Sequence, residues 1–100
     1  MRNEELLIRL TQTQGIAGYE KKVRELIEQE VRPYADELIV DPLGSLIAVK
    51  KGKGGPHPKK IMFAAHMDEI GFMVKKIEED GRLLVCNVGW NWTASAYNTR

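Results

Sequence analysis

A short run at residues 61–65, which reads Ile-Met-Phe-Ala-Ala, constrains the fold more than any other feature of the sequence. An extended segment with apolar side chains on both faces normally lies in the middle of a sheet, with helices covering it. We therefore expect residues 61–65 to form a buried central strand. The rest of the chain must then supply neighbouring strands and covering helices, which predicts the α/β class.

Two amphipathic helices are predicted before this run. Leucines at positions 6, 7 and 10 give an apolar face to a helix over residues 3–12, and apolar residues at positions 23, 26, 27 and 31 do the same over residues 20–32. Gly15 and Gly18 indicate a loop between the two helices. Pro33 is expected to end the second helix, because the residue before a proline disfavours the helical conformation.

Two hairpins are also predicted. Residues 37–41 and 46–49 flank a Pro-Leu-Gly turn signal, and residues 71–77 and 82–88 flank a turn that contains Asp-Gly. Residues 51–58 are rich in glycine, proline and lysine, which predicts an exposed loop.

The composition excludes several classes of protein. The hydrophobic fraction of 43% in 100 residues is too high for a wholly disordered chain. The formal net charge of +1 indicates neither nucleic acid nor an anionic membrane as the main partner. No apolar run is long enough for a signal peptide or a membrane span, and the single cysteine, Cys86, cannot form an internal disulfide. We expect a cytoplasmic protein in which Cys86 is a small buried residue of a strand.

The candidate chemistry follows the apolar run, where His66 and Asp68 stand two residues apart. In an extended chain these side chains share one face, and Glu69 points to the other. Imidazole is a good ligand for zinc or cobalt, and a neighbouring carboxylate can fix its tautomer. The pattern predicts His66 as a metal ligand and Asp68 as the residue that orients it. The pair alone also fits a structural histidine, because a catalytic metal needs about three protein ligands.

Other polar and aromatic residues have simpler interpretations. His57 lies between two prolines and is expected in an exposed loop. Tyr19 and Glu20 are expected to begin the second helix, with the tyrosine ring packed on the sheet. Trp90 and Trp92 could present one aromatic face to a partner, although packing at a strand end is the commoner explanation.

Three blocks occur in a diagnostic order: residues 15–20 (Gly-Ile-Ala-Gly-Tyr-Glu), residues 41–48 (Asp-Pro-Leu-Gly-Ser-Leu-Ile-Ala) and residues 64–74 (Ala-Ala-His-Met-Asp-Glu-Ile-Gly-Phe-Met-Val). With these blocks, residues 6–90 resemble the co-catalytic metallo-aminopeptidase family. This family includes glutamyl and leucyl aminopeptidases, large tetrahedral aminopeptidases, and members labelled endoglucanase or cellulase. Three blocks in order are more specific than any single one.

The resemblance implies the N-terminal part of a mixed-sheet, zinc-peptidase-like catalytic domain over residues 1–70. It implies the opening strands of an inserted β-rich domain over residues 71–90, and residues 91–100 form a tail that shows no resemblance. The family's first metal-ligand histidine matches His66, and the acid that orients it matches Asp68. The other ligands and the glutamate that acts as general base lie downstream in the family, so Glu69 is not that base.

The main functional expectation is therefore an N-terminal fragment of a two-metal aminopeptidase. Such enzymes use zinc or cobalt to activate water and remove N-terminal residues from peptides; this chain alone is expected to be inactive and to bind no metal tightly. The alternative is a non-catalytic module that pairs through an exposed sheet edge with a full-length relative. The sequence also leaves assembly into a homo-oligomer as an alternative. Glycan hydrolysis is a minor alternative, because the paired carboxylates that it needs are not identifiable.

Overall fold

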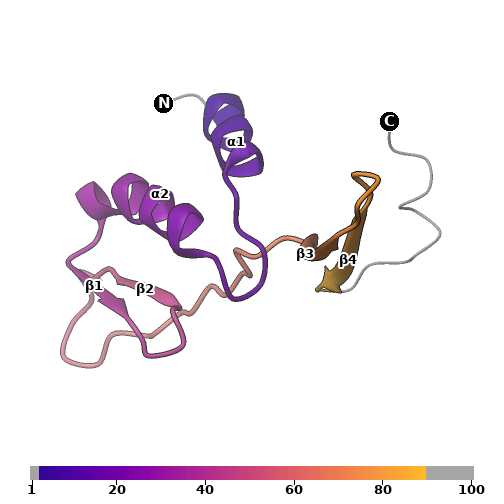
Figure 1. Ribbon diagram of the computed structural model, residues 1–100. Helices are drawn as coiled ribbons and strands as arrows, with labels where there is room; N and C mark the ends of the chain where they lie inside the picture. The colour runs from indigo at the N-terminus through magenta and orange to yellow at the C-terminus, as the bar shows by residue number, and fades with distance from the viewer. Residues whose placement is uncertain (1–2, 90–100) are drawn as a thin grey trace.

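The computed structural model describes residues 3–89 as two helices and two separate hairpins (Figure 1). The elements are α1 (Asn3–Gln12), α2 (Lys21–Val31), the 3-10 turn η1 (Arg32–Tyr34), β1 (Glu37–Val40), β2 (Leu46–Val49), β3 (Gly71–Ile77) and β4 (Leu83–Val88). These helices and strands confirm the α/β class and the two predicted hairpins. Trp90, Trp92 and residues 91–100 lie outside the described residues.

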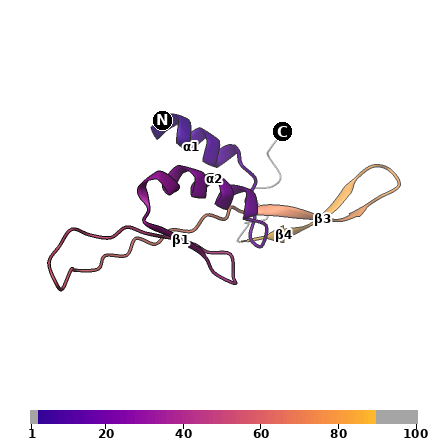
Figure 2. The ribbon, with the colours of Figure 1, turned by 90° about the vertical axis from the view of Figure 1, so that its left-hand side faces the viewer.

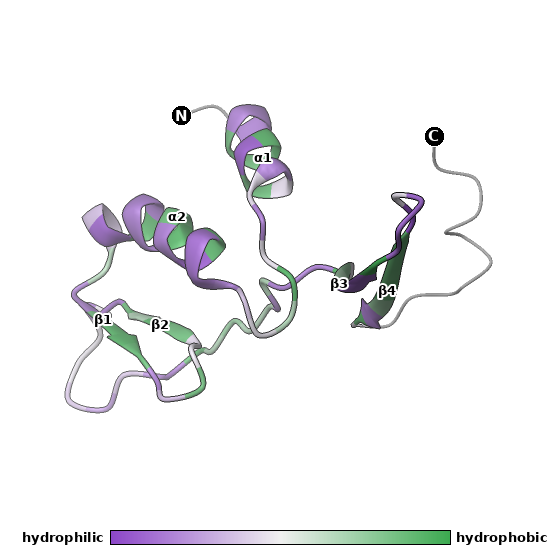
Figure 3. Cartoon of the chain, viewed as in Figure 1, coloured by the Kyte–Doolittle hydropathy of each residue, from purple (hydrophilic) through white to green (hydrophobic). Residues whose placement is uncertain are grey.

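Helix α2 and the β1–β2 hairpin form the packed part of the molecule, with α2 lying across the hairpin (Figure 1). Apolar and polar residues alternate along α2 (Figure 3), and its apolar residues Val23 and Leu26 are 5% and 9% exposed. Burial of such side chains contributes about 1.5–3 kcal/mol each. The helix ends at Val31 because Pro33 follows within a 3-10 turn, as the sequence predicts.

Both hairpins are antiparallel and are closed by glycine-containing turns. Strand β1 pairs with β2 so that Val40 lies opposite Leu46, and β3 pairs with β4 with a register shift between Val74 and Lys76. Gly44 and Gly81 adopt φ angles of 94° and 84°, a region that favours glycine. The β3–β4 hairpin projects away from the helices (Figure 2).

The prediction of a buried central strand at residues 61–65 is wrong for this structure. The segment is extended but belongs to neither sheet, and Ile61, Met62 and Phe63 are 80%, 88% and 95% exposed. A central strand needs partners on both edges, and none of the four described strands lies beside it in a ladder. The segment instead crosses from the lysine-rich loop to β3 without cover (Figure 2).

Two further predictions about packing are wrong for the same reason. Cys86 lies in β4, as expected, but it is exposed, and Tyr19 is 63% exposed instead of having its ring packed on a sheet. Only Val23 and Leu26 form a core among the described apolar residues. The radius of gyration is 18.5 Å, against about 13 Å for a compact domain of this length. His57 is exposed in its loop, as predicted.

Within residues 3–89, no helix has enough length and apolar character to cross a bilayer.

The β1–β2 turn contains a carboxylate whose ionisation is tied to the fold. Asp41 Oδ1 accepts hydrogen bonds from the backbone N–H of Ser45 at 2.8 Å and of Leu43 at 2.9 Å. These N–H groups, Ser45 first, hold the pKa of Asp41 below its ordinary value. Because the folded pKa is the lower one, the turn is stabilised above the unfolded pKa, and this contribution is lost as pH falls through the folded pKa.

We expect the Ser45 amide proton shift to titrate with a midpoint below about 3.9, the value for free aspartate. An NMR titration of the chain measures this midpoint, and Asp41→Asn should abolish the transition. The urea-unfolded chain is the control, in which the Asp41 midpoint should return to the ordinary value. A folded-state midpoint at or above that of the unfolded chain would contradict the role of the turn.

Candidate metal-ligand site at His66

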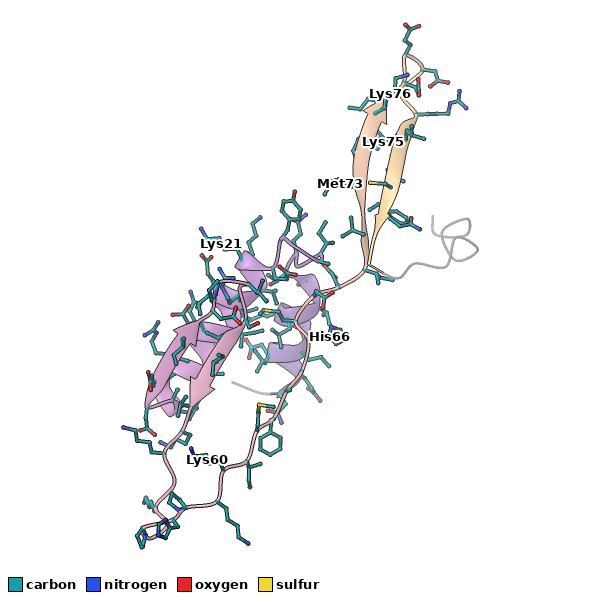
Figure 4. All side chains as sticks on the ribbon, turned by 90° about the horizontal axis from the view of Figure 1, so that it is seen from below. Lys21, Lys60, His66, Met73, Lys75 and Lys76 are labelled. Carbon is teal, nitrogen blue, oxygen red and sulfur yellow. The ribbon has the colours of Figure 1, made fainter. Side chains whose placement is uncertain are left out.

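The predicted site residues meet on the extended segment that leads into β3. His66 Nδ1 lies 3.0 Å from Asp68 Oδ1 and 3.0 Å from the backbone oxygen of Asp68. Figure 4 shows His66 on this segment, between the loop at Lys60 and strand β3. The structure therefore brings His66 and Asp68 together in the arrangement that their spacing predicts.

The partners of His66 determine which ring nitrogen carries the proton. Both atoms next to Nδ1 are oxygen acceptors, so Nδ1 carries the hydrogen and donates it to Asp68. In the neutral ring, Nε2 then keeps a lone pair, which is the form that binds a metal ion. The His66 side chain is 84% exposed, so solutes can reach the ring. Asp68 is 40% exposed and accepts the ring proton, which fixes the ring's orientation.

A small cavity of about 230 Å³ lies beside the pair. It is formed by the start of α2, the β1–β2 turn and the segment around His66, with the lining residues Glu20, Leu43, Gly44, Ser45, Leu46, Ala65, His66, Met67 and Asp68. Its volume is below the roughly 300 Å³ at which pockets for drug-sized ligands begin. A larger open hollow of about 950 Å³ between α2 and the β1–β2 turn contains no histidine. The smaller cavity is therefore the one next to a candidate metal ligand.

The donor set fits one part of a metal site. Within residues 3–89, no group of three or more His, Cys, Asp or Glu side chains is placed to hold a metal ion. A catalytic zinc takes about three protein ligands. His66 therefore fits the role of one ligand, and Asp68 fits the role of its orienting carboxylate, whereas a complete site needs donors beyond these two.

Two neighbouring acids have contacts that the sequence did not reveal. Glu69 Oε1 accepts a hydrogen bond from the Gly15 backbone N–H at 3.2 Å, and the Glu69 backbone N–H donates to the Gly15 oxygen at 2.8 Å. Glu20 stands at the start of α2, as predicted, and its carboxylate accepts from the Gly18 N–H at 2.7 Å. The Gly-x-x-Gly spacing in the loop signals a turn, but no local pattern connects Gly15 to a residue 54 positions later.

The contact between His66 and Asp68 generates a prediction about the tautomer. We expect the neutral His66 ring in the chain to be mainly the Nδ1–H form, because two acceptors face that nitrogen. Asp68→Ala should shift the population towards the Nε2–H form. Ring ¹⁵N shifts measure both states, and His57, which has no hydrogen-bond partner among residues 3–89, is the control in the same spectrum. An unchanged His66 spectrum in the variant would contradict the assignment.

Comparison with known proteins places the chain in a family. The model of the M42 glutamyl aminopeptidase family matches residues 44–100, more than half of the chain. The matched range includes residues 91–100, which the sequence analysis set apart. An Acetivibrio thermocellus protein that carries a provisional aminopeptidase name is 52% identical over 85 residues, which are 85% of this chain and 24% of that protein.

Solved structures agree with this result. The TET aminopeptidase of a Thaumarchaeota archaeon superposes with a TM-score of 0.77 at 37% identity, covering 89% of this chain and 24% of that one. A Thermotoga maritima protein named endoglucanase superposes with a TM-score of 0.73 at 42% identity, covering 83% of this chain and 26% of that one. The chain thus spans about a quarter of the length of these relatives. The resemblance read from the three sequence blocks is confirmed, and the chain belongs to the M42 glutamyl aminopeptidase family.

Proposed function

We propose that this chain is the N-terminal part of a metal-dependent aminopeptidase that removes N-terminal residues from peptides. The observation that carries the proposal is the His66 ring, whose Nδ1 is bonded to Asp68 and whose side chain is 84% exposed. A histidine held in this tautomer presents Nε2 to a metal ion. Family membership supplies the class of reaction.

The residues of this chain have distinct roles in the proposal. His66 would hold one metal ion through Nε2, and Asp68 orients the ring by accepting a hydrogen bond from Nδ1–H, with Nδ1 and Oδ1 3.0 Å apart. Two divalent ions, zinc or cobalt, would supply the polarisation of the peptide carbonyl and the lowered pKa of a bound water. The general base is a residue other than Glu69, whose carboxylate is bonded to Gly15.

The domain division and cellular location belong to the same proposal. Residues 1–70 form part of the catalytic domain, and residues 71–90 open an inserted β-rich domain. The separation of the β3–β4 hairpin from the α2 and β1–β2 unit supports this boundary (Figure 1). A cytoplasmic location is consistent with the single cysteine.

Titration with zinc tests the proposed ligand. We expect Zn²⁺ added to the 100-residue chain to shift the His66 ring resonances, weakly and reversibly with a chelator, because one imidazole cannot hold the ion tightly. His66→Ala should remove the response near residue 66, and His57→Ala is the matched control that should leave it intact. A response centred on His57, or none at His66, would contradict the proposal.

The activity assay tests the role of the missing ligands. The pure chain should release no leucine or glutamate from chromogenic amides, since its described residues provide no complete metal site. Robust, chelator-sensitive release by the pure chain would show that the chain is active by itself, which would contradict this expectation.

A second candidate function is assembly with a full-length relative. The exposed apolar residues Ile61, Met62 and Phe63 favour it, as does the size of the sheets, each of which has two strands within residues 3–89. Glycan hydrolysis is supported by the name of one solved relative alone, and we do not propose it.

Light scattering after size-exclusion chromatography tests this candidate. We expect the chain to co-elute with a full-length relative if the 61–63 segment pairs with it, and Phe63→Asp should weaken that association about tenfold or more through lost apolar burial. Lys53→Asp, in the exposed loop, is the control for added negative charge. A monomer that ignores the relative would exclude the assembly role.

A further inference from the structure

One residue, Glu69, binds both backbone groups of Gly15. Its carboxylate Oε1 accepts from the Gly15 N–H at 3.2 Å, and its own N–H donates to the Gly15 oxygen at 2.8 Å. Ile16 and Glu69 also form an isolated parallel bridge. These contacts join the loop before α2 to the segment that carries His66, across 54 positions of sequence. We call this set of contacts the Gly15–Glu69 clasp.

The clasp lies where the candidate site has little other support. Residues 61–68 belong to neither hairpin, and the segment that includes His66 is extended. In an extended chain, the side chain of Glu69 is directed opposite to that of Asp68. Holding Glu69 therefore also fixes the direction in which Asp68 and His66 point. A slip of one residue in the pairing would turn these side chains to the other side.

Two glycines let the paired segments approach closely. A Cβ added to Gly15 would lie 2.8 Å from Val23 Cγ1, and one added to Gly71 would lie 2.4 Å from Ile16 Cγ2. Both distances are shorter than carbon atoms in contact allow. Val23 is 5% exposed, so the Gly15 end of the clasp is packed against the best-buried part of the molecule. The clasp thus connects the His66 segment to the core of α2.

From this geometry we propose that Glu69 is a positioning residue for the His66–Asp68 pair. Its carboxylate holds Gly15, and through this bond it limits the motion of the segment on which the pair stands. The effect on metal binding rests on the function proposed above, whereas the effect on the motion of the segment does not. Glu69 touches neither the metal ion nor the substrate in this role.

Glu69→Ala and Glu69→Gln separate the role of the hydrogen-bond acceptor from that of charge. In Glu69→Ala, we expect the Gly15 amide to exchange about tenfold faster, because its part-buried N–H loses a hydrogen bond to a charged carboxylate. Order parameters of the residue 66 and 68 amides should fall from about 0.85 towards 0.6. Glu69→Gln keeps an acceptor oxygen and should restore both quantities. Glu79→Ala, in the exposed β3–β4 turn, is the matched control.

A zinc titration of the same variants completes the test. Glu69→Ala should weaken the His66 response several-fold and Glu69→Gln should restore it, while the amides of Val23 and Leu26 remain protected in both. If zinc leaves His66 unperturbed in the parent chain, the proposed function fails, and amide exchange and order parameters still decide the role of Glu69. Should Glu69→Ala keep parental exchange and order, or Glu69→Gln behave like Glu69→Ala, the positioning role is overturned. If Glu69→Ala unfolds α2, the amide exchange and order parameters of the Glu69→Gln variant decide whether Glu69 has the positioning role.

Discussion

The burial of Val23 and Leu26 between α2 and the β1–β2 hairpin is the constraint on which the remaining structure depends. These are the two buried apolar residues of the part that the structure describes, and Gly15 packs directly against Val23. Gly15 is in turn bonded to Glu69, which stands next to Asp68. A continuous set of contacts therefore leads from the small core to the candidate metal ligand. The position of His66 depends on this core although the ring itself lies in solvent.

Local signals were sufficient for the helices and hairpins. The apolar stripe of α2, Pro33 after its last turn, and the glycines of both turns act over a few residues, so the sequence predicts them within one residue of their observed bounds. Residues 61–65 behave differently because a central strand exists only where other strands flank it. Their apolar pattern shows that the segment suits a buried position, but it carries no information on which strands would provide one. The observed exposure of Phe63 is the result.

In the candidate site, too, local sequence predicts some contacts and not others. The contact between His66 and Asp68 follows from their spacing in an extended chain, and the structure shows it at 3.0 Å. The cavity beside them was not predictable, because it needs Glu20 and the β1–β2 turn, which lie more than 20 positions earlier. The bond from Glu69 to Gly15 was missed for a similar reason. The alternation of side chains gives the direction of Glu69, but it cannot identify the partner that the carboxylate meets.

The small core also bears on how a metal ion would be held. A site formed from several segments requires those segments to be fixed before the ion binds, or the binding energy must supply the ordering. Within residues 3–89, the hydrogen bonds of Glu69 to Gly15 tie the His66 segment to the core, while the apolar segment before it is uncovered. Covering Ile61, Met62 and Phe63 would therefore order the same backbone that presents His66. Apolar burial at this segment and metal affinity at His66 are then two effects of one physical change, since both depend on a fixed path for residues 61–69.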